Sequence, residues 1–300
     1  MELRQLRYFT KAKELMNFTE AAAQLFISQS TLSQQIKSLE DELGIPLFNR
    51  VGKHIYITEA GELFYNYALK CVHLANDGYL LLQDLGNLHT GKLVIGVTYG
   101  LKHILTPAII EFYKRYPLVQ IQVIFGTSTE MAEQLYQFKM DFLLTYDNVV
   151  SSNARELKYQ PLFSSELSLI VSSESKMAQK SSITLKDLNS LSLALPAEGF
   201  STRRFIDEVF RKNEITPIVS LEINDIPTLL ELLEAGHWSS ILTRATASDQ
   251  KNLVAIPIRG INTLQQAAVV SLIEVYEKQA VKAFLEILME QLSSPDDMHP

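Results

Sequence analysis

Residues 18–58 read FTEAAAQLFISQSTLSQQIKSLEDELGIPLFNRVGKHIYIT, and this stretch decides the fold of the chain. The pattern predicts two short helices joined by a tight turn and followed by a hairpin. Asn17 or Thr19 can cap the first helix, in which alanines supply helix propensity. Ser28 can cap a second helix that runs to about Leu43.

The second helix has one apolar and one polar face. Its apolar residues recur at spacings of three and four, which is typical of a buried face; they are Leu32, Ile36, Leu39 and Leu43. The polar face carries amides, hydroxyls and one ammonium group, which bond to base edges and phosphates in the major groove of DNA. These residues are Gln29, Ser30, Thr31, Ser33, Gln34 and Lys37. We interpret the segment as a DNA-recognition helix, and the alternative is an ordinary amphipathic helix with a solvated polar face.

The residues after this helix favour the DNA-binding interpretation. Gly44 and Pro46 end the helix. Residues 51–54 then form a basic turn, and residues 55–57 form a strand. A basic hairpin beside a recognition helix is a wing that can reach phosphates or the minor groove, with Arg50, Lys53 and His54 as the candidate contacts.

Residues 1–65 resemble the N-terminal domain of LysR-type transcriptional regulators. The matching segments are Leu6-x-Tyr8-Phe9, Phe18-Thr19-x-Ala21-Ala22, Ser28-Gln29-x-x-Leu32-Ser33-Gln34-Gln35-Ile36-x-x-Leu39-Glu40, Leu43-Gly44-x-x-Leu47-Phe48-x-Arg50 and Thr58-x-Ala60-Gly61. The resemblance implies a winged helix-turn-helix, over residues 1–58, that contacts double-stranded promoter DNA. The expected contacts are Thr19, Ser28, Gln29, Ser30, Thr31, Ser33, Gln34, Lys37, Arg50 and Lys53.

Three residues depart from the family pattern. Ser30 stands where the family often has proline, Thr31 where it often has alanine, and Lys37 where arginine is usual. The first two departures can change which bases are read.

Charge alone does not indicate a nucleic-acid binder. The formal net charge of the 300 residues is −7. Residues 1–60 carry seven Lys or Arg and seven Asp or Glu, so the remaining 240 residues hold the whole excess of negative charge. The prediction of DNA binding therefore rests on the motif, and affinity should still fall with salt because phosphate contacts release counterions.

The composition also excludes several classes of protein. Hydrophobic residues make up 47% of the chain, which is enough for a sizeable core. Cys71 is the one cysteine, so no disulfide can form within the chain and no Cys-x-x-Cys metal site exists. The N-terminus lacks the apolar core of a signal peptide, and no apolar run reaches membrane-spanning length. We expect a cytoplasmic protein with no cofactor and no membrane partner.

The spacing of apolar residues over residues 59–89 predicts a long helix with a heptad seam. The seam residues are Ala60, Phe64, Tyr67, Cys71, Leu74, Gly78, Leu81, Leu85 and Leu88. Thirty helical residues would reach about 45 Å. The alternative is a core helix of a single globule. In LysR-type proteins the equivalent segment is a dimerising linker helix, which implies a homodimer or homotetramer and a DNA site with inverted repeats.

From residue 90 onward, predicted strands alternate with predicted helices, which indicates an α/β domain with a largely parallel sheet. Residues 157–171 are rich in strand formers with Pro161 midway, and residues 267–273 form a return strand. Two crossings, near residues 161 and 266, divide residues 90–293 into lobe I (90–161 and 267–293) and lobe II (162–266). This layout resembles the two-lobed effector domain of LysR-type regulators, which shares its fold with type 2 periplasmic binding proteins.

Ligands of such domains sit at the carboxyl ends of strands and the N-termini of helices. The loops expected there contain Thr98, Tyr99, Gly100, Leu101, Thr127, Ser128, Thr129, Phe200, Ser201, Thr202 and Asp225. These residues fall in four loops, near residues 98–101, 127–129, 200–202 and 225. Three of the four loops offer hydroxyls at helix starts, which suits an anionic effector. The alternative is that Thr127, Ser128 and Ser201 are only helix caps. His103, Arg203 and Arg244 can supply positive charge, although a surface or structural role is favoured for each.

Catalysis finds little support in the sequence. The six histidines are scattered, and neither His-Glu-x-x-His, Gly-x-Ser-x-Gly nor a phosphate-binding glycine loop is present. We therefore predict a non-enzymatic regulator controlled by a small molecule, with RNA polymerase as a further partner. Two alternatives remain, namely a solute receptor or solute-binding enzyme built on the same lobes, and a structural DNA-binding protein without a ligand.

Overall fold

The computed structural model describes residues 1–51, 54–84, 91–146, 156–273 and 275–293. The chain forms two compact units, Met1–Gly86 and Asn87–Pro300. The boundary expected at residues 89–90, the seam residues Leu85 and Leu88, and the wing residue Lys53 lie outside the described residues.

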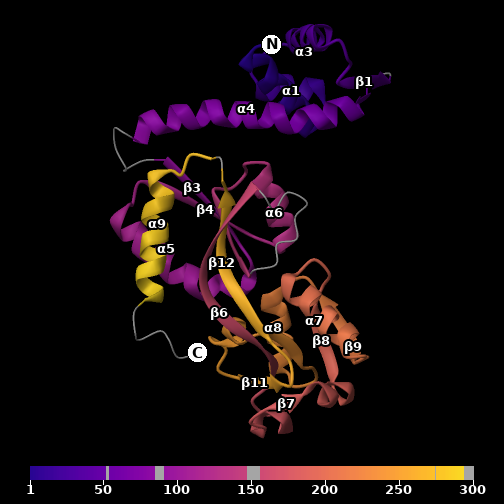
Figure 1. The fold of residues 1–300 in the computed structure, drawn as a ribbon, viewed down its shortest axis with the longest axis vertical. Helices are drawn as coiled ribbons and strands as arrows, with labels where there is room; N and C mark the ends of the chain where they lie inside the picture. The colour runs from indigo at the N-terminus through magenta and orange to yellow at the C-terminus, as the bar shows by residue number, and fades with distance from the viewer. Residues whose placement is uncertain (52–53, 85–90, 147–155, 274, 294–300) are drawn as a thin grey trace. The chain divides into compact units, whose positions relative to one another are not determined.

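The first unit is a helical head with a hairpin (Figure 1). Its elements are α1 (Leu3–Leu15), α2 (Phe18–Gln24), α3 (Gln29–Leu43), β1 (Phe48–Val51), β2 (His54–Ile57) and α4 (Glu59–Asp84). The predicted helix pair and hairpin are confirmed. The core is rich in aromatic rings: Phe9 contacts Phe48 at 5.5 Å, and Phe18 meets the same ring edge-on at 5.4 Å between ring centres.

Local capping explains where the two short helices begin and end. The Asn17 side chain accepts hydrogen bonds from the backbone N–H groups of Thr19 and Glu20, at 3.0 and 3.1 Å. Ser28 Oγ accepts from the N–H of Thr31 at 3.1 Å. Gly44 closes α3 with φ +70°, a left-handed conformation that glycine adopts without steric cost.

The helix α4 is joined to the hairpin by a close approach of backbones. Thr58 Oγ1 donates to the Leu47 carbonyl at 3.1 Å and accepts from the N–H of Gly61 at 2.9 Å. A Cβ at Gly61 would lie 2.4 Å from the Leu47 carbonyl oxygen, so only glycine fits. The start of α4 is therefore held against the base of the wing.

Two faces of α4 differ in burial. Tyr65 and Ala68 are buried in the head core together with α1, and Phe64 packs against the same core. Phe64, which the heptad pattern assigns to the seam, is half-buried and packs against the head core. Tyr67 and Leu74 are 72% and 57% exposed, and the seam residues Cys71, Gly78 and Leu81 are exposed as well. The sequence pattern also missed Leu63, which is 67% exposed on the same face.

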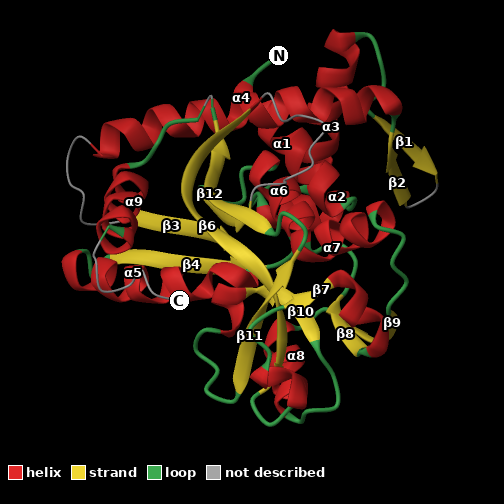
Figure 2. Cartoon of the chain, turned by 60° about the horizontal axis from the view of Figure 1, so that its bottom comes forward, coloured by secondary structure: helices red, strands yellow, loops and turns green. Residues whose placement is uncertain are grey.

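The second unit is built on an eight-stranded sheet (Figures 1 and 2). Its strands are β3 (Gly91–Val97), β4 (Val119–Phe125), β5 (Phe142–Tyr146), β6 (Leu157–Ser172), β7 (Ile183–Thr184), β10 (Ser240–Thr243), β11 (Leu253–Arg259) and β12 (Leu264–Leu272). The order is β4-β3-β5-β12-β6-β11-β7, and β10 also pairs with β6. A separate parallel pair consists of β8 (Ser192–Pro196) and β9 (Ile218–Ile223).

The prediction of a largely parallel sheet is wrong. Strand β12 runs antiparallel to both β5 and β6, and β6 is antiparallel to β10 and β11. The reason is that β6 and β12 form one long antiparallel ribbon that runs between the two halves of the unit, and the strands beside it, β5, β10 and β11, each pair antiparallel with a ribbon strand. The two expected crossing points face each other, because Pro161 pairs with Ala268 and the register shifts between Gln266 and Ala268.

Two sets of helices accompany the sheet. They are α5 (Lys102–Arg115), α6 (Ser128–Tyr136), α7 (Ser201–Lys212), α8 (Ile226–Glu234) and α9 (Gln279–Leu292), with short 3-10 turns η1 (Tyr99–Leu101), η3 (Lys176–Gln179), η4 (Leu185–Ser190) and η5 (Arg244–Ala247). Helices α5 and α9 close one core around Phe112, Phe142 and Phe284. Separate cores form under α7, around Ile206, and under α8, around Leu229. Among the helices described, none is long and apolar enough to cross a membrane.

Candidate DNA interface and effector cleft

The predicted recognition face of α3 is accessible. Leu32, Ile36 and Leu39 point into the head core and are fully buried. On the polar face Gln29, Ser30, Thr31, Gln34 and Lys37 are exposed, and Ser33 is half-buried. Thr19 and Ser28 are exposed as well.

The N-terminus of α3 presents a cluster of hydroxyl groups. Ser28 Oγ lies 2.8 Å from both Ser30 Oγ and Thr31 Oγ1. The first turn contains no acidic residue. Free N–H groups and the helix dipole favour negative charge at such an end, so it suits a phosphate or a base-edge acceptor.

The wing residue Arg50 is held against the recognition helix. Its Nη1 donates to Ser33 Oγ at 2.9 Å, and its guanidinium carbon lies 5.1 Å from the centre of the Phe18 ring. The side chain is therefore held beside α3 and is exposed. His54 is also exposed, at the start of β2.

Sequence reasoning missed one positioning residue in the head. Glu40 Oε1 accepts hydrogen bonds from the backbone N–H groups of Leu47 and Phe48, at 2.8 and 2.9 Å. This carboxylate ties the last turns of α3 to the first residues of the wing. The sequence signal was the acid near the end of the predicted helix.

In the second unit, seven of the expected effector residues meet in one cleft. The empty space among its lining residues, counted to the open solvent, is about 380 Å³. The expected residues that line it are Thr98, Tyr99, Gly100, Ser128, Phe200, Ser201 and Thr202. Ile226, which follows Asp225 in the last of the expected loops, lines it as well. Four more line it that were not expected, namely Tyr146, Pro196, Leu242 and Thr246.

Four expected residues do not line this cleft. Leu101 is fully buried in the hydrophobic core beside α5. Thr127 caps α6 in a reciprocal pair with Glu130, and Asp225 caps α8 by accepting from the N–H and hydroxyl of Thr228. These hydrogen bonds from Thr228 lower the pKa of Asp225. Thr129 lies in the first turn of α6, where it contacts Arg204.

The cleft lining is polar but uncharged. Its hydroxyl groups come from seven Ser, Thr and Tyr residues: Thr98, Tyr99, Ser128, Tyr146, Ser201, Thr202 and Thr246. Thr98, Ser128 and Ser201 are almost completely buried. The first turns of α6, α7 and α8 each supply a lining residue. Uncharged donors and positively polarised helix ends together suit a small polar or anionic molecule.

The base of the cleft is closed by Tyr146. Its hydroxyl donates toward the Gly100 carbonyl at 3.3 Å and lies 3.4 Å from Thr243 Oγ1, in a different half of the unit. Burial raises the pKa of Tyr146 to about 12, so the phenol is neutral. A Cβ at Gly100 would lie 2.8 Å from the Tyr146 ring.

The three candidate cationic residues have other roles or positions. Arg203 is buried and donates to Asp207, Glu222 and the Pro196 carbonyl, which makes it a structural residue of α7. His103 packs edge-on against Phe163, and burial lowers its pKa. Arg244 is exposed.

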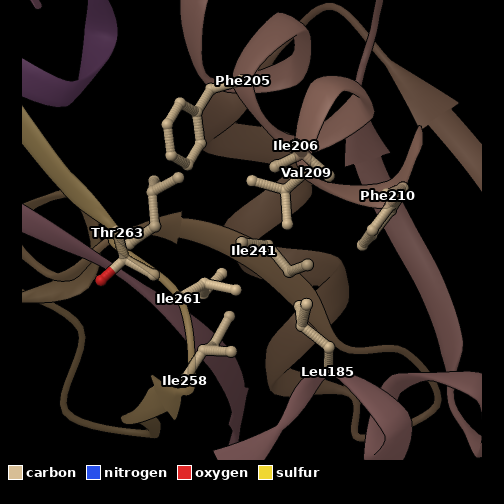
Figure 3. Close-up of a pocket in the computed structure, with 10 residues that line it drawn as sticks. Leu185, Phe205, Ile206, Val209, Phe210, Ile241, Ile258, Ile261 and Thr263 are labelled. Atoms are coloured by element: carbon tan, nitrogen blue, oxygen red, sulfur yellow. The ribbon is translucent and has the colours of Figure 1, made fainter. Parts of the chain in front are cut away.

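A second cavity, below α7, has a different character (Figure 3). It is enclosed by aliphatic and aromatic side chains that include Phe205, Ile206 and Ile258, with Thr263 at its edge. The same cluster forms the core of this half, so we interpret the space as a packing void without a site for charge. Within the described part of the chain, no group of three or more His, Cys, Asp or Glu is placed to hold a metal ion.

Two family models match the chain. Residues 3–62 match the bacterial regulatory helix-turn-helix protein, lysR family, and residues 86–293 match the LysR substrate binding domain. A relative is the uncharacterized HTH-type transcriptional regulator YwqM of Bacillus subtilis (strain 168). It is 34% identical over 253 residues, which cover 83% of this chain and 84% of YwqM.

Solved structures share the fold. Full-length CbnR complexed with its target DNA has a TM-score of 0.63 at 22% identity, covering 97% of this chain and 99% of CbnR. The CcmR regulatory domain of Synechocystis PCC6803, in complex with 2-PG, has a TM-score of 0.63 at 19% identity, covering 69% of this chain and 99% of that domain. With both family models matched along nearly its whole length, the chain belongs to the LysR family of transcriptional regulators, which bind DNA and carry an effector-binding domain.

Proposed function

We propose that residues 1–58 form the DNA-binding domain, residues 59–89 the dimerising linker helix, and residues 90–293 the effector domain with the two lobes defined above. The DNA contacts are those of α3 together with Thr19, Ser28 and the wing residues Arg50 and Lys53. The observation that carries this proposal is the exposed polar face of α3, opposite three fully buried apolar residues. The DNA bound by a full-length CbnR of the same fold supports it.

Selection from a pool of random DNA duplexes tests this proposal. We expect the full-length protein to enrich an inverted repeat, because two recognition helices in a symmetric dimer face half-sites of opposite direction. Affinity for the enriched site should fall steeply with salt. Enrichment of no sequence would instead support the alternative of a structural DNA-binding protein.

The protein acts as a homodimer or homotetramer in this proposal. The exposed apolar face of α4, with Leu63, Tyr67 and Leu74, is the pairing surface of the linker. A second apolar surface lies on α5 and on the segment that leads into the edge strand β4, where Ile110, Tyr113 and Leu118 are 54–69% exposed. Two separate self-pairing surfaces are what a dimer of dimers requires.

Sedimentation of a linker variant tests the assembly. Leu74→Glu should reduce the mass of the particle, because it places a charge in an apolar interface. Ala75→Glu is the matched control, since the next residue of a helix points about 100° away and Ala75 is also exposed. If neither variant had a smaller particle mass than the wild type, this face of α4 would be excluded as the interface.

We place a small anionic effector in the cleft between the lobes. The support is a lining of hydroxyl groups, three helix N-termini and no acidic side chain among the lining residues. The 2-PG bound by the CcmR regulatory domain is consistent with a small molecule in this kind of domain. The effector shifts the populations of lobe arrangements, and the oligomer passes this shift to the bound promoter and to RNA polymerase in the cytoplasm.

Thermal denaturation of the full-length protein tests the proposed effector site. The melting temperature is measured with a panel of metabolites that consists mainly of carboxylates and inorganic anions. A ligand at about 100 times its dissociation constant adds about 2.7 kcal/mol to the free energy of unfolding. Thr98→Ala or Ser201→Ala should abolish the shift. A stabilising compound that is insensitive to both substitutions would bind elsewhere. Turnover of that compound would favour the alternative of a solute-binding enzyme.

A further inference from the structure

The recognition helix, the wing and the linker helix are joined at the backbone of two residues, Leu47 and Phe48. Glu40 Oε1, in the last turn of α3, accepts hydrogen bonds from both of their N–H groups, at 2.8 and 2.9 Å. On the other side, the Leu47 carbonyl accepts from the N–H of Thr58 at 3.0 Å and from its Oγ1 at 3.1 Å. The Leu47 peptide groups are therefore bonded both to α3 and to the residue that precedes α4.

The first turn of α4 lies directly against this junction. Thr58 Oγ1 also accepts from the N–H of Gly61, which lies in that turn, at 2.9 Å. A Cβ at Gly61 would clash with the Leu47 carbonyl oxygen, and the Leu47 side chain is almost completely buried. No free space separates the two segments, so a displacement of the first turn of α4 also displaces the Leu47 backbone.

The recognition helix is bonded to the hairpin at a second point. Ser33 Oγ accepts from Nη1 of Arg50, in β1, at 2.9 Å. Ser33 and Glu40 are seven residues apart, so they lie on one face of α3, about 10.5 Å apart along its axis. A single bond would leave the helix free to pivot on the hairpin. Two bonds separated by this distance fix the angle between them.

These hydrogen bonds supply a restraint that the apolar core of the head does not supply. Helix α1 packs against both α3 and α4. This packing holds the helices together, but the hydrophobic effect is non-directional. Hydrogen bonds weaken steeply when their angle falls below about 120°, and bonds to a carboxylate are roughly twice as strong as neutral ones. We therefore assign the distance between the helices to the core, and their angle to the bonds of Glu40 and Thr58.

We propose, on the basis of the dimer and the inverted repeat proposed above, that Glu40 and Thr58 are positioning residues that set the spacing of the two DNA half-sites. The linker helices join the subunits, so the direction of each recognition helix depends on the angle between α3 and α4. One additional base pair between the half-sites rotates the second by about 34° and moves it by about 3.4 Å. A rigid junction does not follow this change, and the dimer then engages only one half-site.

Binding of the full-length protein to duplexes of different spacing tests this proposal. The duplexes are the one that selection from random DNA enriches, and versions in which the spacer is one or two base pairs longer or shorter. The wild type should lose about a hundredfold in affinity at a wrong spacing, because the avidity from the second half-site is lost. Glu40→Ala and Thr58→Val should bind the correct duplex about threefold to tenfold more weakly, and their penalty for a wrong spacing should be less than about tenfold.

Matched variants separate the hydrogen bonds from charge and from side-chain shape. Asp41→Ala removes a carboxylate from the next residue of α3, which is exposed, and should keep the wild-type ratio of affinities between spacings. Glu40→Gln keeps an oxygen that can accept from both N–H groups, and Thr58→Ser keeps the hydroxyl. Each should therefore keep most of the spacing preference. A merely structural defect would weaken binding to every duplex alike and leave the ratio unchanged.

Hydrogen exchange tests the junction without DNA. The N–H groups of Leu47 and Phe48 should exchange faster in Glu40→Ala than in Asp41→Ala, because only the first substitution removes their acceptor. Equal exchange rates in the two variants would show that Glu40 does not hold the junction, and its positioning role would be overturned.

The binding data separate this proposal from the assembly on which it rests. If a single half-site binds the wild type as tightly as the inverted repeat, the proposed dimeric reading of DNA is wrong, and the positioning role fails with it. If the inverted repeat binds more tightly but the wild type has no preferred spacing, only the positioning role is overturned. The same conclusion holds if Glu40→Ala and Thr58→Val keep the wild-type spacing preference.

Discussion

The recognition face of α3 and the effector cleft are built from similar side chains in opposite environments. On α3, amides such as Gln29 and Gln34 are exposed, so water can satisfy their hydrogen bonds. In the cleft, Ser128 is 0% and Ser201 5% exposed, so their hydrogen bonds must be made within the protein. Substitutions on α3 should therefore change binding without changing stability, whereas substitutions in the cleft should change both.

The largest expected effect is on DNA binding. Gln34→Ala combined with Lys37→Ala should cost about 2–5 kcal/mol of operator binding free energy, since a bidentate base contact contributes about 1–3 kcal/mol and a phosphate contact adds to it. The melting temperature should not change. Fluorescence anisotropy with the selected operator measures the loss, and Lys11→Ala is the control. Unchanged operator affinity in the double variant would show that the recognition helix has been misplaced.

A matched pair of serines compares the two environments directly. Ser128→Ala removes a buried acceptor of Arg204 and should lower the free energy of unfolding by about 1–2 kcal/mol. Ser30→Ala, at an exposed position of α3, should change it by less than about 0.5 kcal/mol. Denaturant unfolding of both full-length variants measures the difference. Equal effects would contradict the distinction between exposed and buried hydroxyls.

A substitution in the turn between α2 and α3 should have a smaller effect on the free energy of unfolding, and it should raise stability instead of lowering it. Phe26 is 95% exposed and has φ +56°, a left-handed backbone conformation that residues other than glycine rarely adopt. Phe26→Gly should therefore stabilise the head by about 0.5–1 kcal/mol. Phe26→Ala keeps the backbone penalty and is the control. If both variants were equally stable, the backbone conformation would not be the source of the gain.

The smallest expected effect concerns pH. Burial lowers the pKa of His103 in the folded state below its usual value of 6.5, so the unfolded chain binds the proton more readily. Stability from this residue is present above pH 6.5 and is lost as the pH falls toward the lowered pKa. His103→Gln should flatten the pH dependence of thermal unfolding of the effector domain in this range, and His54→Gln, at an exposed position, should not. The same slope in both variants would exclude His103 as its cause.

The head was predictable from sequence because its signals are local. Ser28 and Gly44 cap α3 within a few residues of the positions they define, and the spacing of Leu32, Ile36 and Leu39 reports their burial directly. Glu40 was missed because its partners, the amides of the wing, lie across a turn.

The cleft was only partly predictable because residues from distant strands complete it. Helix starts identified Ser128 and Ser201, but Tyr146 enters the site from strand β5 and Thr246 from the turn η5. Arg203 and Arg204 are adjacent in sequence, and only the direction of each side chain shows which one faces the other half. The ribbon partner of β6, β12, likewise lies about a hundred residues further along the chain.

The ribbon of β6 and β12 has a consequence for how the effector domain can move. Two strands joined by a ladder of hydrogen bonds keep a nearly constant length, but they bend and twist where the ladder is irregular. The irregularity lies between Gln266 and Ala268, opposite Pro161, which has no N–H to donate. The two halves can therefore rotate about this point while their separation stays the same. In the function proposed above, effector binding changes the angle between the two halves, and a symmetric oligomer can transmit a change of angle to DNA without breaking its own interfaces.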